Sequence, residues 1–544
     1  MGKKSKRSRA NSNKEISGTR KTKGTSSENS GSAAPALRRI VDEEEEETLE
    51  NLRFQDPFED IYEDDEEIVV HNNSSDEEME KVIEEVTEED AEASAVATRA
   101  WTPSQGLQPG QTLEMSTKAY TMHHSLTPEW PALSFDFIRD TYGNARTKFP
   151  HTVLCVVGTQ ASKREWNKIQ ILKMTDLSRT HKPKIKYGND DMMDEDTDDE
   201  DDDDSSSDEE AVDCDPVLEH IALAHNGGVN RIRVMPTLLK PTSSTAGDME
   251  LPSLPKRQLV ATWSDVSHVN LYDISSCLDH FEKSCGNFGA TSPSASESSY
   301  PKKPFFTYRG HPTEGYAMDW SKLSLGHLAT GDCSGQIHLW TPTESNYSVS
   351  CGYIGAQSVE DIQWSPTEKT VFATASASQG LIQIYDTRRQ GKSMISTEAH
   401  PGTDVNVIGW NPLVTNLLSS GADDGTWSVW DLRMFGGSKP PEPLARFTYS
   451  KKPITSMEWH PTDESMIVVT DEDATYVYDL SIEADPEEEA QQKVVEQEQD
   501  VPPQLLFLHC GSESTKEAHW HPQIPSLVMT TALSGFNIFI PSNL

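Results

Sequence analysis

A repeated unit of 45 to 48 residues constrains the fold of this chain more than any other feature of its sequence. The clearest copy begins at His400 and contains three short apolar runs, separated by a Trp-Asn-Pro turn and an Asp-Asp-Gly turn. The copies end at Trp340, Tyr385, Trp430 and Tyr478, which are 45, 45 and 48 residues apart. Short β-branched and aromatic runs between turn residues are typical of strands, and this period is typical of a four-stranded propeller blade.

Counting the copies predicts an all-β, seven-bladed β-propeller over residues 100–544. Six copies carry the landmarks, and residues 112–174 fit a degenerate seventh. The ring of blades has to close, because an open sheet edge favours aggregation. We expect a strand near residues 131–137 to close it. The acidic stretches 189–215 and 483–500 are expected as loop insertions between blades 1 and 2 and between blades 6 and 7.

These landmarks resemble those of the WD-repeat family over about residues 110–544. The resemblance implies a hydrogen-bonded tether within a blade, made by a loop His, a strand Ser or Thr, a turn Asp and a Trp. The residues that match this pattern are His400, Ser420, Asp424 and Trp430. Two other blades depart from it, because Ser334 and Gln379 stand where the turn Asp is expected, and we expect incomplete tethers there.

Most of the net charge of −42 lies in a few segments. The net charges are +9 for residues 1–39, −23 for 42–92, −17 for 189–215 and −7 for 483–500, which leaves −4 for the rest. Blocks of like charge repel themselves, so we expect a basic disordered tail at 1–40 and an acidic disordered region with short motifs at 41–99. This balance argues against direct sequence-specific binding of nucleic acid and favours basic proteins as partners.

We expect a nuclear and nucleolar protein, with a cytoplasmic pool as an alternative place of client capture. No apolar run approaches 18 residues and the N-terminus has no apolar core, so the sequence predicts neither a membrane helix nor a secretory signal. The seven cysteines form no Cys-x-x-Cys pair, which indicates free thiols. A basic cluster typical of nuclear targeting comprises Lys3, Lys4, Lys6, Arg7 and Arg9.

The acidic segments contain the candidate partner-binding residues. One group places aromatic rings among carboxylates, and two others are runs of carboxylates. They are Phe54, Asp56, Pro57, Phe58, Glu59 and Asp60, then Asp201, Asp202, Asp203 and Asp204, and then Glu487, Glu488 and Glu489. Serines beside acidic runs are candidates for phosphorylation, which would add further negative charge. They are Ser74, Ser75, Ser205, Ser206 and Ser207.

Motifs for catalysis are missing from the sequence. It contains no P-loop, no G-x-G-x-x-G before a helix, no H-E-x-x-H and no G-x-S-x-G. The aspartate run lacks the glycine and the spacing of a calcium loop. We therefore expect no enzyme activity, no cofactor and no metal site, and we expect a monomeric platform whose function depends on its attached segments.

Three segments narrow the resemblance within the WD-repeat family. Leu-Thr-Pro-Glu-Trp-Pro-Ala-Leu at 126–133 and Pro-Pro-Gln-Leu-Leu-Phe at 502–507 resemble signatures of histone-binding WD proteins. There, a helix and an acidic loop clamp a basic histone helix, and they correspond to residues 112–124 and 483–500. Residues 112–124 contain two His, which argues against a long helix. Asp-Pro-Phe-Glu-Asp at 56–60 resembles the glutamate-rich WD-repeat family.

That last resemblance implies a ribosome biogenesis factor. Members of the family escort the basic ribosomal protein L-three of the large subunit during 60S assembly, and histones and pre-ribosomal particles are further partners. A histone-binding chaperone is the first alternative. A substrate receptor of a cullin ubiquitin ligase is the second, because Trp-Asp-Leu-Arg at 430–433 resembles the box of such receptors and 385–388 does so loosely. Neither alternative involves a membrane.

Overall fold

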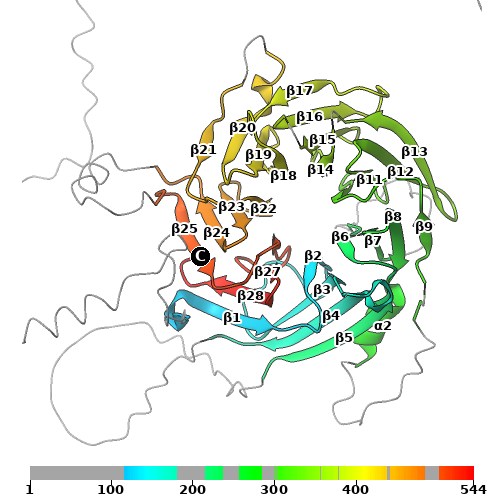
Figure 1. Ribbon diagram of the computed structural model, residues 1–544. Helices are drawn as coiled ribbons and strands as arrows, with labels where there is room; N and C mark the ends of the chain where they lie inside the picture. Colours follow the sequence, from blue (N-terminus) through cyan, green and yellow to red (C-terminus); the bar gives the residue numbers. More distant parts are fainter. Residues whose placement is uncertain are drawn as a thin grey trace, which may run out of the picture. The chain divides into compact units, whose positions relative to one another are not determined.

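The computed structural model describes a ring of seven four-stranded antiparallel sheets within one compact unit, residues 92–544 (Figure 1). The described residues are 115–180, 215–236, 257–284, 300–301, 303–355, 357–377, 379–437, 441–483 and 501–544. The prediction of an all-β, seven-bladed propeller is therefore confirmed.

The strands of each blade are given from the innermost outwards. Blade 1 has β2 (Ala132–Phe137), β3 (His151–Thr159), β4 (Lys168–Leu177) and β5 (Val217–Ala224); blade 2 has β6 (Val229–Val234), β7 (Leu259–Ser264), β8 (His268–Asp273) and β9 (Phe306–Tyr308); blade 3 has β10 (Ala317–Trp320), β11 (Leu328–Gly331), β12 (Gln336–Pro342) and β13 (Tyr347–Ile354). Blade 4 has β14 (Val359–Trp364), β15 (Val371–Ser376), β16 (Leu381–Asp386) and β17 (Ile395–Glu398); blade 5 has β18 (Val405–Trp410), β19 (Leu417–Ala422), β20 (Trp427–Asp431) and β21 (Ala445–Phe447). Blade 6 has β22 (Ile454–Trp459), β23 (Met466–Asp471), β24 (Ala474–Asp479) and β25 (Leu505–Cys510); blade 7 has β26 (Glu517–Trp520), β27 (Val528–Ala532), β28 (Gly535–Pro541) and β1 (Tyr120–Leu126). The helical elements are η2 (Thr117–Ala119), η3 (Arg164–Trp166), α2 (Ser275–Ser284) and η4 (Leu432–Met434).

Apolar side chains between adjacent sheets hold the blades together. Between blades 2 and 3, Trp263, Trp320 and Trp340 lie in one buried cluster with Leu271 and Leu328. Middle strands are covered on both faces, and all six residues of β7 are buried. The outermost strand β5 alternates between buried and exposed residues in its second half, as expected for a strand with one solvated face. The repeated aromatic residues are therefore core residues.

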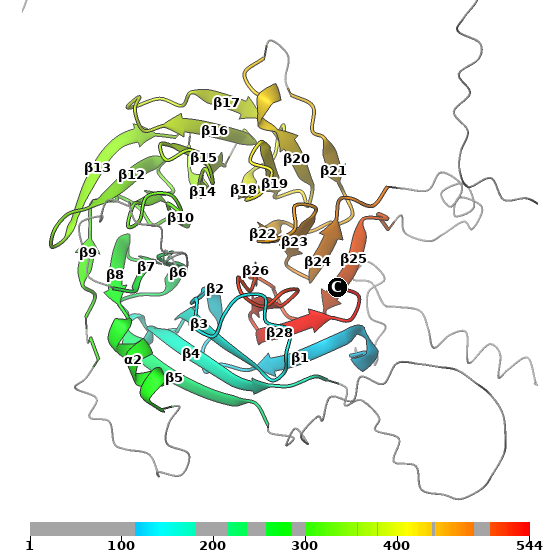
Figure 2. The ribbon, with the colours of Figure 1, turned by 180° about the vertical axis from the view of Figure 1, so that it is seen from behind.

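The ring closes through β1, which pairs with the last strand of the chain. Tyr120 lies opposite Pro541 and Leu126 opposite Phe536 in an antiparallel register (Figures 1 and 2). The prediction of a closing strand near residues 131–137 is wrong, because Ala132–Phe137 forms the innermost strand of blade 1. Burial explains the error. The innermost strand is strongly apolar, whereas β1 is an outermost strand with polar residues on one face, so its sequence signal is weaker.

The acidic insertions lie within blades and not between them. The segment after β4 returns to β5 of the same blade 1, and the segment after β24 returns to β25 of the same blade 6. The predicted positions of residues 189–215 and 483–500 are therefore wrong by one strand. The sequence repeat ends at the third strand, and a blade continues with a fourth strand that carries few landmarks.

The tether of blade 5 contains one residue more than the sequence pattern predicts. His400 Nε2 lies 2.8 Å from the Ser420 hydroxyl, which also accepts a hydrogen bond of 2.8 Å from Trp430 Nε1. Asp424 does not reach the imidazole directly. Thr426 lies between them, since its hydroxyl is 3.1 Å from His400 Nδ1 and donates to Asp424 at 2.7 Å.

Blade 3 has the direct tether that the sequence pattern did not predict. His311 lies 2.8 Å from Asp332 Oδ2 and 2.8 Å from the Thr330 hydroxyl, which accepts from Trp340 Nε1 at 3.0 Å. The expectation of an incomplete tether, based on Ser334, is therefore wrong. Asp332 precedes Ser334 by two residues and supplies the carboxylate, because the turn places it beside the histidine ring.

Candidate functional site

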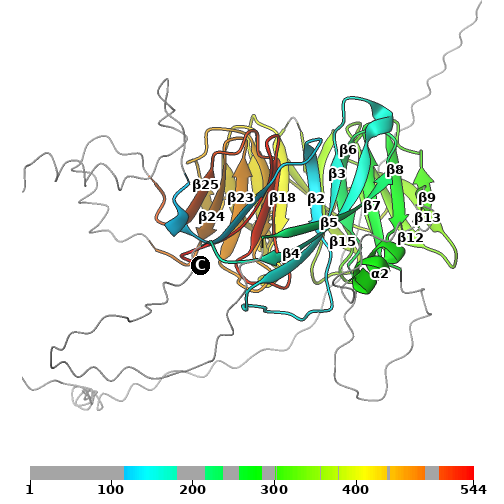
Figure 3. The same cartoon turned by 90° about the horizontal axis from the view of Figure 1, so that it is seen from below.

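One face of the propeller carries the turns that follow the innermost strands, and we call it the Trp-x-Pro face. The turns that define it are Trp364-Ser365-Pro366, Trp410-Asn411-Pro412, Trp459-His460-Pro461 and Trp520-His521-Pro522. Neighbouring strands are antiparallel, so the third strand of each blade also ends at this face and the outermost strand begins there. The ends of β4 and β24 and the start of β1 therefore lie at the same face (Figure 3).

Three acidic segments of the sequence join the propeller at this face. Residues 181–214 follow β4 of blade 1, residues 484–500 follow β24 of blade 6, and the N-terminal region precedes β1 of blade 7. These three blades are neighbours in the ring (Figure 1). The stretches 42–92, 189–215 and 483–500 have a combined net charge of −47, so this charge enters the fold through three consecutive blades.

Hydrogen bonds connect the three attachment points, and we call residues 119–124, 178–180, 506 and 542–543 the arm sector. The backbone N–H of Thr180 donates to the carbonyl of Thr121 at 3.0 Å, which joins blade 1 to β1. Asn543 Nδ2 donates to the carbonyl of Leu506 at 2.8 Å, which joins blade 7 to blade 6. The acidic segments are therefore anchored on a continuous, internally bonded surface.

A central cavity of ≈ 580 Å³ is lined by residues of the innermost strands and by prolines of the Trp-x-Pro face. Every blade contributes the residue just before the end of its innermost strand. These residues are Asp136, Arg233, Asp319, Gln363, Gly409, Glu458 and His519. Several of them bind the backbone of the next blade. Asp136 accepts from the Val234 N–H at 2.7 Å and Asp319 accepts from the Trp364 N–H at 2.7 Å. The ring is thus both a cavity wall and a set of bonds between blades.

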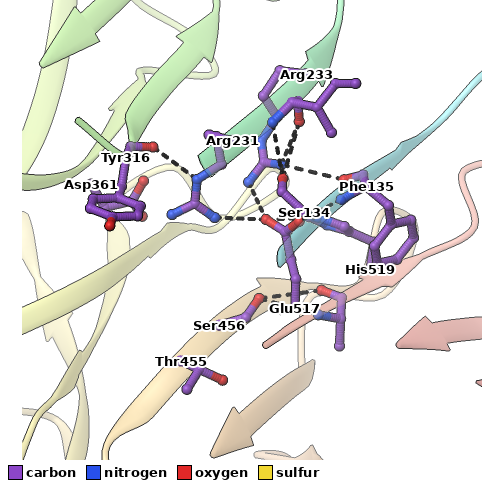
Figure 4. A network of polar contacts seen from close by, with 12 residues as sticks. Ser134, Phe135, Arg231, Arg233, Tyr316, Asp361, Thr455, Ser456, Glu517 and His519 are labelled. Atoms are coloured by element: carbon purple, nitrogen blue, oxygen red, sulfur yellow. Dashed lines mark hydrogen bonds and ion pairs between the residues drawn. The ribbon is translucent and has the colours of Figure 1, made fainter. Parts of the chain in front are cut away.

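Glu517 holds a buried charge cluster above this ring. Its side chain is 1% exposed and lies 2.7 Å from Arg231 and 2.6 Å from Arg233, measured from Oε1 to the guanidinium nitrogens (Figure 4). Its second oxygen accepts from the Phe135 backbone N–H at 2.9 Å. Burial opposes ionisation, but the charges of Arg233, His519 and Arg231 hold the pKa of Glu517 well below its usual range. The cluster joins blades 7, 2 and 1.

Comparison with known proteins identifies the family. The family model of the histone-binding protein RBBP4 and its counterpart in the CAF1 complex matches residues 110–178, and the model of the WD domain, G-beta repeat, matches residues 391–431. A Dictyostelium discoideum relative named glutamate-rich WD repeat-containing protein 1 is 38% identical over 442 residues, 80% of this chain and 83% of that protein. The chain belongs to the glutamate-rich WD-repeat protein family.

Two further relatives of this glutamate-rich WD-repeat protein align over most of both chains. Ribosome assembly protein rrb1 of Schizosaccharomyces pombe is 34% identical over 487 residues, 89% of this chain and 92% of that protein. Protein HEAT STRESS TOLERANT DWD 1 of Arabidopsis thaliana is 38% identical over 466 residues, 84% of this chain and 93% of that protein.

The two family matches on this glutamate-rich WD-repeat protein fall on informative parts of the fold. The first covers β1 to β4 and so includes the closing strand and one side of the arm sector. Among residues 115–126 the structure has only the 3-10 turn η2 and β1, so no long helix stands there. The second match runs from before β17 of blade 4 to the end of β20 of blade 5. It therefore shares the offset between repeat and blade.

Most of the predicted site residues of this family member lie outside the described residues. They are the basic cluster at 3–9, the acidic-aromatic group at 54–60, the carboxylates at 201–204 and 487–489, and the serines at 74–75 and 205–207. Of the seven cysteines, the five that are described are free thiols. Within the described ranges, no helix is long and apolar enough to span a bilayer, and no group of His, Cys, Asp and Glu is arranged to hold a metal ion.

The central cavity was missed by sequence reasoning. Its wall residues are one per repeat and spread from Asp136 to His519, so no local motif indicates them. The signal that would find them is the column of residues that directly precede the repeat landmark in register, such as Asp319 before Trp320 and Glu458 before Trp459. Charged residues in a column that faces the centre of a ring indicate a polar channel.

His519 provides a pH dependence of stability that can be measured. Burial lowers the pKa of this imidazole, but Glu458, 3.0 Å from Nδ1, and Glu517, 3.4 Å from Nε2, outweigh it and raise the pKa to about 9. A folded-state pKa above the unfolded value contributes stability that is fully present below pH 6.5 and lost as pH rises through about 9.

We expect His519→Gln to remove this dependence. The difference in the free energy of unfolding between wild type and the variant should be largest, up to about 3 kcal/mol, near pH 6 and should shrink towards pH 9.5. Denaturant unfolding across this range measures it. The matched control is His220→Gln, at an exposed histidine of β5, which should give a flat difference. A flat difference for His519→Gln would contradict the prediction.

Proposed function

We propose that this chain is a ribosome biogenesis factor that escorts a basic protein of the large ribosomal subunit, ribosomal protein L-three, during 60S assembly. The observation that carries the proposal is the attachment of segments with a net charge of −47 to three consecutive blades of one rigid ring. The relative named ribosome assembly protein, which aligns over 92% of its length, supports the same assignment. The protein then acts as a binding platform in the nucleus and nucleolus and not as an enzyme.

The mechanism follows from the charge of such a client. A free ribosomal protein carries basic extensions that bind any polyanion, and carboxylate segments occupy them in place of RNA. Exposed ion pairs contribute only about 0–1 kcal/mol each and are screened by salt. Many of them together give rapid association without fixed geometry, and the complex yields to the denser charge of ribosomal RNA. The residues at 54–60, 201–204 and 487–489 are the proposed client contacts.

Neutralising the acidic segments tests the function. In the variant, residues 42–92 and 189–215 are replaced by Gly/Ser linkers of equal length, so the propeller and its spacing are kept. We expect the affinity for purified ribosomal protein L-three to fall at least about tenfold at low salt and its salt dependence to flatten. Calorimetric titrations at about 50 mM and about 500 mM salt measure both quantities. A wild-type affinity that is equal at the two concentrations contradicts the proposal.

A histone-binding chaperone is the second candidate, and the match of a histone-binding family model to residues 110–178 favours it. The same acidic segments would serve a basic histone. Affinity purification at low salt with mass spectrometry separates the two, because one client should be recovered in stoichiometric amount. Recovery of histones and not of the ribosomal protein would replace the first proposal by the second.

The ubiquitin-ligase alternative rests on two arginines at the ends of third strands. Arg433 donates to Asp431 through Nε at 2.9 Å and Nη2 at 2.6 Å, and its side chain is 71% exposed. Arg388 and Asp386 form the same pair in blade 4. One relative carries the letters DWD in its name. Recovery of a cullin ligase component in the same purification is the result that would favour this reading.

A further inference from the structure

Three carboxylates in the central cavity accept their hydrogen bonds from the backbone. Asp319 on β10 accepts from the Trp364 N–H, Asp361 on β14 accepts from the N–H groups of Ile362 and Ile408 at 2.9 and 3.0 Å, and Asp136 on β2 accepts from the next blade. Among the described residues, no Lys or Arg nitrogen forms an ion pair with any of the three. Their charge is therefore uncompensated at close range.

The cations of the cavity are already engaged by other carboxylates. Arg231 and Arg233 contact Glu517, and His519 contacts Glu458. Counted over the inner wall, five carboxylates face three cations, so two negative charges remain. The counted residues are Asp136, Asp319, Asp361, Glu458 and Glu517 against Arg231, Arg233 and His519. Burial raises the pKa of Asp319 to about 7, as expected for a carboxylate without a counter-ion.

Two exposed cations stand at the rim of the same cavity. Lys322 and Arg139 line it, and both are exposed to solvent. The charge of Lys322 acts on Asp319 and on Glu458, which are on different blades, so the ammonium lies towards the opening. A mobile lysine at the rim screens the inner charge without filling the cavity. An incoming cation can take over this role.

The aromatic wall suits a cationic group as well. Trp320, Trp364, Trp410, Trp459 and Trp520 line the cavity. The indole of Trp364 is fixed, because its Nε1 donates to the Asp319 carbonyl at 3.1 Å, and that of Trp520 donates to the Glu458 carbonyl at 3.1 Å. Indole faces attract guanidinium and ammonium groups. A volume of ≈ 580 Å³ accommodates one long side chain and excludes a folded element.

We propose that the central cavity binds a single arginine or lysine side chain of a basic polypeptide, with Asp319 and Asp361 as its counter-charges. The side chain enters at the Trp-x-Pro face, which also carries the acidic segments. Those segments attract a basic chain without fixed geometry, and the cavity adds one defined contact. The inference rests on the proposed function only in that a basic client supplies the side chain.

The test uses the full chain and a pentapeptide probe, acetyl-Gly-Gly-Arg-Gly-Gly-amide, beside the same peptide with neutral citrulline. The first variant is Asp319→Asn with Asp361→Asn, which keeps an acceptor oxygen at each position. The second is Lys322→Gln at the exposed rim. The matched control is Glu368→Gln, an exposed carboxylate in the turn after β14 at the same face, with the same change in net charge per substitution.

We expect the double variant to bind the arginine peptide at least about tenfold more weakly than wild type, and Lys322→Gln to bind it a few-fold more tightly. Glu368→Gln and the citrulline peptide should show no effect. Calorimetry measures affinity, and thermal unfolding verifies that each variant is folded. Equal loss in the double variant and in Glu368→Gln overturns the proposal, because affinity would then follow net charge alone.

Two further outcomes are decisive. If the double variant does not fold, Lys322→Gln decides, and a failure to tighten binding of the arginine peptide overturns the proposal. If methylguanidinium binds at the cavity and the peptide does not compete with it, the ligand is a free amine and the proposal of a polypeptide side chain is wrong. Failure of either kind leaves the salt-dependent capture of the client by the acidic segments untouched, so the two proposals fail separately.

Discussion

The substitution Glu517→Gln is expected to destabilise the propeller by about 3–5 kcal/mol. Glu517 is 1% exposed and balances the charges of Arg231 and Arg233, which are 15% and 18% exposed. A neutral amide leaves both guanidinium groups buried without a counter-ion. The loss is greater than that of an ordinary ion pair, because the partners that remain carry the cost of desolvation.

The position of Glu517 in the ring adds to this effect. Its contacts come from β26, β6 and β2, so they connect the first and last blades near the seam of the ring. The matched control is Glu472→Gln. Glu472 forms a pair of 4.0 Å with Lys516, and these side chains are 43% and 31% exposed, so we expect a change of about 0–1 kcal/mol. Denaturant unfolding compares the two variants, and equal losses would contradict the assignment.

Removal of the closing strand is expected to abolish the soluble monomer. A chain that starts after Leu126 leaves the outer edge of β28 unpaired and loses the buried side chains of Tyr120 and Met122. Met122 is fully buried, and Tyr120 packs against His509 and Phe539. An open edge with unpaired N–H and C=O groups associates with other chains. Size-exclusion chromatography should therefore show aggregates or oligomers.

The control for this truncation is a chain that starts at residue 111 and keeps β1 whole. It should elute as a monomer, with a melting temperature within a few degrees of wild type. If the chain without β1 is also monomeric and equally stable, the seam does not depend on this strand. The comparison separates the closing strand from the N-terminal region that precedes it.

The sequence predicts the blades well because each blade repeats the same packing problem. Trp340, Tyr385, Trp430 and Tyr478 recur since each fills the space between two sheets, and that requirement is local. The closing strand was misplaced because β1 has one solvated face and pairs with a strand at the far end of the chain. Its identity depends on a partner that no local pattern reveals.

The tethers show how a turn can defeat a positional pattern. Thr426 stands between His400 and Asp424, and Asp332 takes the role expected two residues later in blade 3. The residue types were right, and the backbone path of each turn decided which oxygen reached the imidazole. The central cavity lies further from local prediction, because it exists only when all seven blades bring their inner strands to one axis.

The pairing of β1 with β28 also orders events during synthesis. Tyr120 lies beside Pro541, so blade 7 cannot form until the final residues of the polypeptide have left the ribosome. The acidic N-terminal region is translated first, but the surface that anchors it is completed last. A nascent or prematurely terminated chain would carry much of the negative charge without the closed ring. The seam therefore makes a complete client-binding surface a mark of a fully translated protein.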